Sequence, residues 1–189
     1  MQKIIFIGGA SGVGKTTFAR ELAIKNKAEY LHFFKYFHSF FGKPDKKHYY
    51  ELLNYFTQIL IKQLKASDND VFIDMHYALQ LDSINCWSKR AVDPNAKFYP
   101  SLKKESIKLL KSYFDVYAIM LLTGYGNIDK RFGIRKEQFE KEQEGELEQY
   151  LNLPLENERK LMLLRTDLKF MAQLLQSYIL GKRLENQMI

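Results

Sequence analysis

Eight consecutive residues near the N-terminus have the types and the spacing of a phosphate-binding loop. They match the pattern G-x-x-x-x-G-K-[ST] in full: Gly9, Ala10, Ser11, Gly12, Val13, Gly14, Lys15 and Thr16. The glycines let successive backbone N–H groups turn inward around phosphate oxygens, and Lys15 brings an ammonium to the β- and γ-phosphates. Thr16 offers a hydroxyl to Mg²⁺, and Thr17 can reach the α-phosphate. The sequence therefore predicts binding of a nucleoside triphosphate, expected to be ATP, together with Mg²⁺.

A second polar group follows a short apolar run at residues 71–73. Asp74 comes directly after this run, and His76 follows two residues later. P-loop sites usually hold Mg²⁺ with an acidic residue at the C-terminal end of a neighbouring strand, directly or through water. We expect Asp74 to have this role, with a turn or capping role as the alternative. His76 would emerge on the same side, either to contact a substrate or as a packed loop histidine.

A strand, a turn and a helix must position the loop, and the flanking residues supply those signals. Residues 3–7 are typical of a buried parallel strand, and residues 16–26 have the apolar spacing of a helix. Further strands are predicted at residues 71–73 and 116–122, and at the start of the aromatic-rich segment 28–41. Helices are predicted from the capping residue Asp45 through residue 65, and from a capping residue Ser101 to about residue 113.

Four segments nearer the C-terminus have weaker signals. Residues 78–100 have no clear period and contain two prolines, which predicts a long irregular connection. Residues 131–150 are charged almost throughout, which favours a solvent-exposed helix or lid over a core element. One last amphipathic helix is predicted from the spacing of Leu161, Leu164, Leu168, Met171 and Leu175, and a final edge strand at 182–187.

The alternation of strands and helices sets the expected architecture. It predicts an α/β fold with a parallel sheet and helices on both of its faces. No repeat or linker divides the sequence, so residues 1–189 are expected to form a single domain.

The net charge of +7 is unevenly distributed along the chain. Residues 1–65 contain eleven Lys and Arg against four Asp and Glu, whereas residues 66–189 contain eighteen of each. The positive surplus around the loop would attract polyphosphate ligands, although a solvated basic face without function is an equal alternative. Nucleic acid is a less favoured partner, because no basic stripe with regularly interleaved aromatics is present.

Composition also limits the location of the protein. The single cysteine, Cys86, excludes an internal disulfide, and no apolar run approaches the ~20 residues that a bilayer span requires. The apolar stretch at residues 4–7 is too short for a signal peptide. We therefore expect a cytoplasmic protein without membrane contact.

Several segments together resemble the small nucleoside monophosphate kinases, and most closely the archaeal-type adenylate kinases and adenylate-kinase-like proteins. The resemblance lies in the loop at residues 8–17, in Asp74-Met75-His76, in Phe98-Tyr99-Pro100-Ser101-Leu102, and in residues 116–122 followed by 127–131. It implies a P-loop NTPase fold with three α/β/α layers and a parallel sheet of about five strands. It also implies a mobile acceptor-binding segment at about residues 30–65 and a mobile lid at about residues 127–152. It also implies transfer of the γ-phosphoryl group of Mg-ATP to a nucleoside monophosphate or similar small acceptor.

The resemblance also suggests roles for individual residues. Lys15 and Asp74, with Arg131 and Arg135 from the lid, would be catalytic. His76, Lys89 and Arg90 would contact the acceptor. There is no arginine between Arg20 and Arg90, so lysines or Arg90 would have to bind an acceptor phosphate, and lysine lacks the bidentate fork of arginine.

Two other functions are compatible with the same loop. One is a P-loop ATPase that couples hydrolysis to binding of RNA or of a protein partner. The other is a nucleotide-binding module without catalysis. The sequence does not identify the acceptor or the oligomeric state.

Overall fold

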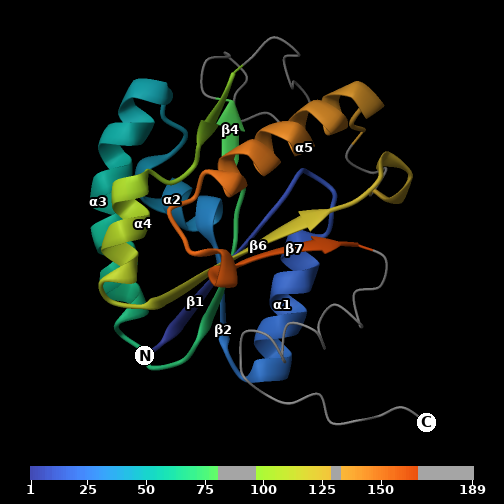
Figure 1. The fold of residues 1–189 in the computed structure, drawn as a ribbon. Helices are drawn as coiled ribbons and strands as arrows, with labels where there is room; N and C mark the ends of the chain where they lie inside the picture. Colours follow the sequence, from blue (N-terminus) through green and yellow to red (C-terminus); the bar gives the residue numbers. More distant parts are fainter. Residues whose placement is uncertain (81–96, 129–132, 166–189) are drawn as a thin grey trace, which may run out of the picture.

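Five parallel strands form one sheet at the centre of the molecule. The computed structural model describes residues 1–80, 97–128 and 133–165. The sheet has the order β2-β3-β1-β6-β7 and consists of β1 (Lys3–Gly8), β2 (Glu29–His32), β3 (Val71–Asp74), β6 (Asp115–Leu122) and β7 (Lys160–Leu164) (Figure 1). All neighbouring strands in it are parallel. The predicted α/β class and five-stranded parallel sheet are confirmed.

The register of the sheet brings the ends of three strands together. Asp74 is paired with Ile7 of β1 and with His32 of β2. Because the strands are parallel, their carboxyl ends lie at one edge of the sheet, and the loop that follows β1 begins at this edge. Open α/β sheets bind ligands at this edge. The topology therefore places the predicted phosphate loop and Asp74 next to each other.

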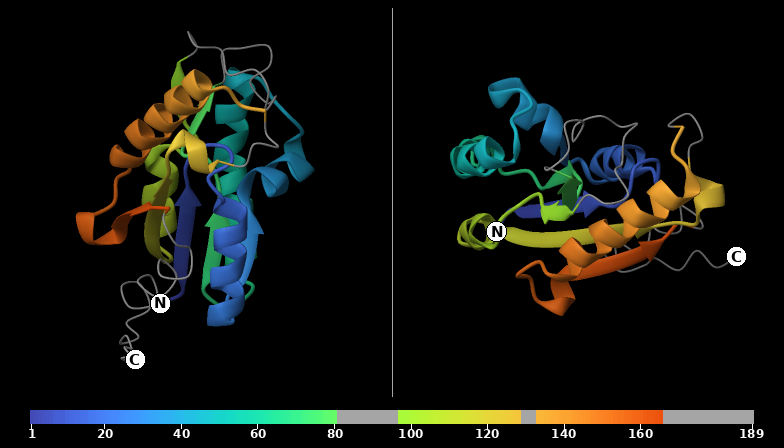
Figure 2. Two further views of the ribbon diagram at one scale, coloured as in Figure 1. Left: turned by 90° about the vertical axis from the view of Figure 1, so that its right-hand side faces the viewer. Right: turned by 90° about the horizontal axis from the view of Figure 1, so that it is seen from above.

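Helices lie on both sides of the sheet (Figure 1 and Figure 2). On one side, α1 (Lys15–Asn26) packs through Phe18 and Leu22 against Ile5 and Ile7. The opposite side is covered by α2 (Phe33–Phe41), α3 (Lys46–Leu64) and α4 (Lys104–Lys111), whose core includes the fully buried Phe56. Successive β1 residues point to opposite faces, so one strand supplies both cores. The predicted three-layer arrangement is confirmed.

The capping residues confirm one predicted helix start and show that another prediction was wrong. The Asp45 side chain accepts a hydrogen bond from His48 N at the start of α3, as predicted. Ser101 was expected to cap the next helix, but α4 begins at Lys104 and Lys103 is its N-cap. Ser101 is instead fully buried beneath α3, where its carbonyl accepts a hydrogen bond from the Tyr49 hydroxyl.

The segment predicted to be irregular has ordered ends. β4 (Ala78–Gln80) and β5 (Phe98–Pro100) form a separate antiparallel pair, with Leu79 opposite Tyr99. Three-residue strands carry too short a pattern for periodicity to reveal. Residues 81–96, between the two strands, lie outside the described residues.

The acidic segment forms a helix with one buried face, so the prediction of a solvent-exposed segment is wrong. α5 (Lys136–Leu151) lies beside β4 and β5 and also contacts β6 (Figure 1). A Cβ on Gly145 would lie 2.4 Å from the Phe98 ring, which shows how closely helix and hairpin approach. The buried face consists of Phe139, Glu142, Gly145, Glu146 and Tyr150. The two acids on this face can be buried because each accepts hydrogen bonds, Glu142 from Ser11 and Glu146 from Tyr77.

The last strand replaces the start of a predicted helix. Leu161 and Leu164 lie in β7, which pairs with β6 along its length. A run of four apolar residues, 161–164, fits either period, and the free edge of β6 favours the strand. The short 3₁₀ turns η1 (Tyr125–Asn127) and η3 (Asn157–Arg159) flank this part of the chain. Residues 168–175 and 182–187 lie outside the described residues.

Candidate functional site at the phosphate loop

The loop between β1 and α1 has a backbone conformation that favours glycine. Gly14 has a φ of 95° and is the N-cap of α1, and Gly9 has a φ of 141°. A Cβ on Gly9 would also lie 2.4 Å from the carbonyl oxygen of Leu121. The loop therefore delivers the N-terminus of α1 to the edge of the sheet, and unpaired N–H groups at a helix N-terminus bind anions. Thr16 is half-buried there and Thr17 is exposed.

Lys15 is held at the loop by the backbone of the loop itself. Its side chain is buried, and Nζ donates hydrogen bonds to Gly9 O at 2.7 Å and to Ala10 O at 2.9 Å. A buried ammonium is stable only where acceptors replace its water. The loop carbonyls do this, so a full positive charge lies at the phosphate loop.

Asp74 is a buried carboxylate beside the loop. It is 1% exposed, and Oδ2 accepts a hydrogen bond from the Tyr30 hydroxyl at 2.9 Å. Burial and the charge of Asp74 raise the pKa of Tyr30 to about 12, so the phenol remains a donor at neutral pH. Oδ1 has no hydrogen-bond partner of acceptable geometry among the described residues, although His32 Nδ1 lies 3.2 Å away. This second oxygen is suited to a ligand hydroxyl or to a metal-bound water.

A second group of polar side chains joins α5 to the loop. Glu142 Oε1 accepts hydrogen bonds from Ser11 N at 2.9 Å and from Ser11 Oγ at 2.8 Å. Glu146 Oε1 lies 2.5 Å from His76 Nδ1, and Oε2 accepts a hydrogen bond from Tyr77 N at 2.6 Å. His76 Nδ1 also lies 3.6 Å from Glu142 Oε1. The result is a continuous chain of contacts from the phosphate loop through α5 to the residues after β3.

Burial determines the protonation of the Glu146–His76 pair. Burial raises the pKa of the fully buried Glu146 to about 8, against the opposing effect of Lys15. Burial and the charge of Lys15 lower the pKa of His76. At neutral pH the pair therefore carries one proton on Glu146, whose carboxylic acid donates to a neutral imidazole.

The same atoms have a spacing that a metal ion can use. Ligand atoms of His76, Glu142 and Glu146 all lie within 4.8 Å of one another. Their hydrogen bonds to one another, to Ser11 and to Tyr77 already account for this spacing. We therefore treat them as a hydrogen-bonded group rather than as a metal centre.

The structure brings together some of the predicted site residues and leaves others out. The loop residues 9–17, Asp74 and His76 lie at one edge of the sheet. Arg135 is exposed and precedes the first residue of α5. Arg131, Lys89 and Arg90 lie outside the described residues. Their predicted roles stay predictions.

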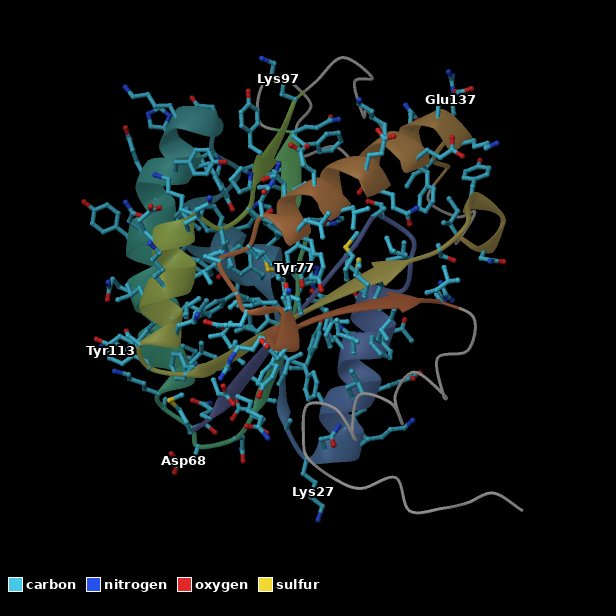
Figure 3. All side chains as sticks on the ribbon, in the orientation of Figure 1. Lys27, Asp68, Tyr77, Lys97, Tyr113 and Glu137 are labelled. Atoms are coloured by element: carbon cyan, nitrogen blue, oxygen red, sulfur yellow. The ribbon has the colours of Figure 1, made fainter. Side chains whose placement is uncertain are left out.

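Sequence reasoning missed Glu142, Glu146, Tyr77 and Arg165 as parts of this site. The Tyr77 ring covers Gly8, where an added Cβ would lie 2.2 Å from it, and Tyr77 lies near the middle of the molecule (Figure 3). Arg165, directly after β7, donates through Nη1 to Val13 O at 3.0 Å. Glu142 and Glu146 are four residues apart and share a helix face with Phe139. This spacing could have indicated that the two acids are buried, because it places them on an apolar helix face.

No protein-family model matches the sequence, and no curated protein has significant similarity to it. Solved structures do match. A sugar kinase from Janibacter sp. HTCC2649 has a TM-score of 0.57 at 15% identity, covering 95% of this chain and 94% of that one. Shikimate kinase from Aquifex aeolicus vf5 has a TM-score of 0.51 at 10% identity, covering 94% and 96%. The chain shares the fold of these two kinases.

A third match extends over part of a longer protein. A NadR protein in complex with NR has a TM-score of 0.56 at 15% identity, covering all of this chain and 54% of that one. At such identities the P-loop kinase fold is shared, whereas substrates have to be argued from the site. In the described parts of this chain, no helix has the length and hydropathy of a membrane span.

Proposed function

We propose that this protein is an ATP-dependent phosphotransferase that moves the γ-phosphoryl group of Mg-ATP to a small acceptor. One observation carries the proposal. The loop that contains Lys15 follows β1 directly, and it lies beside Asp74, the last residue of the neighbouring strand β3. Phosphoryl transfer requires positioning and neutralisation of charge more than covalent chemistry. The fixed cation of Lys15 and the adjacent carboxylate of Asp74, at one edge of the sheet, meet these requirements.

The donor would be held by residues 9–17. Backbone N–H groups of the loop and of the first turn of α1 would bind the phosphates, and Lys15 would neutralise the β- and γ-oxygens. Thr16 and Asp74 are the residues that would hold Mg²⁺, and the Oδ1 atom of Asp74 fits a coordinated water. The metal supplies neutralisation of charge on the transferring group.

The acceptor would bind next to Asp74, between the ends of β2 and β3. The resemblance to adenylate kinases favours a nucleoside monophosphate here, with His76, Lys89 and Arg90 as contacts and Arg131 and Arg135 as residues of a closing lid. The structural matches with a sugar kinase and a shikimate kinase are equally compatible with an acceptor that carries no phosphate. The assignment of a kinase does not depend on this choice.

A coupled ADP assay tests the proposal. The full chain is incubated with Mg-ATP and with nucleoside monophosphates, nucleosides and the small-molecule fraction of cells that contain the protein. We expect at least one of these to accelerate ADP formation and to gain a phosphate. If ATP binds but no addition accelerates its turnover, the kinase proposal is wrong. ADP formation that responds only to RNA or to a protein partner would indicate the ATPase alternative.

A further inference from the structure

Arg165 joins the last strand of the sheet to the phosphate loop. It directly follows β7, and its backbone N–H donates a hydrogen bond to Leu122 O at 2.8 Å, which continues the pairing of β7 with β6. Two residues earlier, Leu163 packs in the same core cluster as Phe18 of α1. The backbone that carries the Arg165 side chain is therefore fixed relative to the sheet and to the helix that follows the loop.

The guanidinium of Arg165 lies against the backbone of the loop. Its Nη1 donates a hydrogen bond to Val13 O at 3.0 Å, although the two residues are 152 positions apart in the sequence. A Cβ on Gly14 would lie 3.2 Å from Nη1 and 3.4 Å from Cζ. The lack of a side chain at Gly14 thus lets the guanidinium lie close to the loop.

This hydrogen bond determines the direction of the next N–H group. Peptide bonds are planar, and none is cis among the described residues, so the C=O of Val13 and the N–H of Gly14 point in opposite directions. Because Arg165 holds the carbonyl, the N–H of Gly14 points away from the guanidinium. Within the described parts of the chain this N–H has no hydrogen-bond acceptor. Gly14 is the N-cap of α1, where N–H groups are suited to bind phosphate oxygens.

Arg165 also brings a positive charge to the loop. No carboxylate in the described ranges forms an ion pair with it, and its side chain has Val13 O as hydrogen-bond acceptor. A guanidinium stays protonated in proteins. Lys15 holds the carbonyls of Gly9 and Ala10 in a similar way. Cations therefore hold three carbonyls of the loop, and both cations add positive charge where a polyphosphate would bind.

We infer that Arg165 is a positioning residue of the donor site, which fixes the Gly14 N–H toward the polyphosphate of the nucleotide. The inference rests on the proposed function and adds a residue from the end of the sheet to the donor site. Arg165 acts through the loop rather than through the base, so it affects every polyphosphate that the loop binds. Its contribution is to binding, because the loop holds the donor both before and during transfer.

Two probes that share only a phosphate chain test the inference. Mg-ATP is titrated into the full chain by calorimetry, and inorganic tripolyphosphate is titrated in competition with it, both in excess Mg²⁺. Arg165→Ala is expected to weaken both by about 10-fold or more, the effect of losing a hydrogen bond from a charged group. Lys25→Ala removes one positive charge at an exposed position in the last turn of α1. It is the matched control and should bind both probes as the wild type does.

Two further variants separate the contact from the stability of the chain. Arg165→Met keeps the apolar stem of the side chain and removes the donor and the charge, so it should match Arg165→Ala and replaces it if the alanine variant does not fold. Arg165→Lys keeps the charge and one donor but lacks the planar fork, and a loss of about threefold is expected. Urea unfolding of each variant reports whether the chain is folded.

Steady-state ADP formation gives a readout that a merely structural role would not change. Loss of binding that is equal in the ground state and the transition state raises KM for Mg-ATP and leaves kcat unchanged. A partly folded variant contains less active protein, which lowers kcat and leaves KM unchanged. We expect KM to rise about 10-fold in Arg165→Met, with kcat within about twofold of wild type.

The outcomes separate this inference from the proposed function. Unchanged affinity for both probes in Arg165→Ala and Arg165→Met overturns the inference and leaves the kinase proposal standing. A loss for Mg-ATP alone also overturns it, and would place Arg165 at the base or the ribose. Wild-type protein that binds Mg-ATP but not tripolyphosphate contradicts it too, because the loop then contributes too little to affinity. Wild-type protein that binds neither probe overturns the proposed function together with the inference.

Discussion

The phosphate loop and the cluster of buried carboxyl groups formed by Asp74, Glu142 and Glu146 lie next to each other but arise in different ways. The loop is a contiguous run from Gly9 to Thr17, and its cation is held by its own backbone. The cluster takes one member from β3 and two from α5, which are about seventy residues apart, as the contact between His76 and Glu146 illustrates. The basic loop is thus encoded locally, whereas the acidic cluster exists only in the folded chain.

The test with the largest expected effect removes the cation of Lys15. Lys15→Ala is expected to lower ATP-dependent turnover by about 1000-fold, because the charge that neutralises the transferring phosphoryl group is lost. Steady-state ADP formation measures the effect. Lys25→Ala, exposed in the last turn of the same helix, is the control and should be near wild type. A Lys15→Ala protein that is folded by circular dichroism and keeps more than about a tenth of the rate would contradict the donor site.

Asp74 belongs to both sides, and its variant sharpens the comparison. Asp74→Asn is expected to lower turnover by about 100-fold, within the range for loss of a group that accepts a proton. If the side chain also holds Mg²⁺, the metal concentration for half-maximal rate rises. Titration with Mg²⁺ at saturating ATP separates the two roles, and Asp68→Asn at an exposed turn is the control. An unchanged metal requirement refutes the metal role alone.

Glu146 allows a test of stability on the acidic side. The folded pair of Glu146 and His76 keeps one proton up to the raised pKa of about 8, whereas the unfolded chain has lost it above the ordinary histidine value of 6.5. Unfolding therefore releases a proton between these values, and the free energy of unfolding should fall by about 1.4 kcal/mol per pH unit as pH rises. Between the ordinary glutamate value of 4.5 and the ordinary histidine value of 6.5, each state holds one proton, and the pair contributes no slope.

Glu146→Gln should remove this slope, because the amide does not titrate. Urea unfolding at several pH values between 6 and 8.5 measures it, with Glu144→Gln as the control on the exposed side of α5. A slope that persists in Glu146→Gln would show that the carboxyl is ionised in the folded protein.

The smallest expected effect concerns the contact between the two sides. Glu142→Gln retains an acceptor for Ser11 but removes a negative charge next to the phosphate loop. ATP should then bind about fivefold more tightly, since the triphosphate no longer meets this charge. Calorimetry with Mg-ATP measures the change. Weaker binding would place Glu142 among the groups that support the donor.

The features that sequence predicted well are those with local causes. The helix after the loop and the Asp45 cap depend on residues within one turn of each other, and both are confirmed. The sheet followed from apolar runs that alternate with helices. The position of Asp74 followed from parallel pairing, which brings strand ends to one edge.

The features that sequence missed depend on distant partners. Acidic residues on α5 indicated solvent exposure, because their partners His76 and Tyr77 are far away in the sequence. β7 was predicted as the start of a helix because its four apolar residues fit both a helical and a strand period. Only pairing with the free edge of β6 decides between them. In both cases the deciding contact is tertiary.

Tyr77 connects α5 to the central sheet. Its hydroxyl lies 3.0 Å from Phe6 O and 2.9 Å from Ile119 O, while its backbone N–H is bound by Glu146. The C-terminal half of α5 is thereby tied to two central strands through one residue. We therefore expect the turn of α5 that contains Glu146 to move with the sheet, so that any closing motion of the predicted lid would involve residues before Glu146.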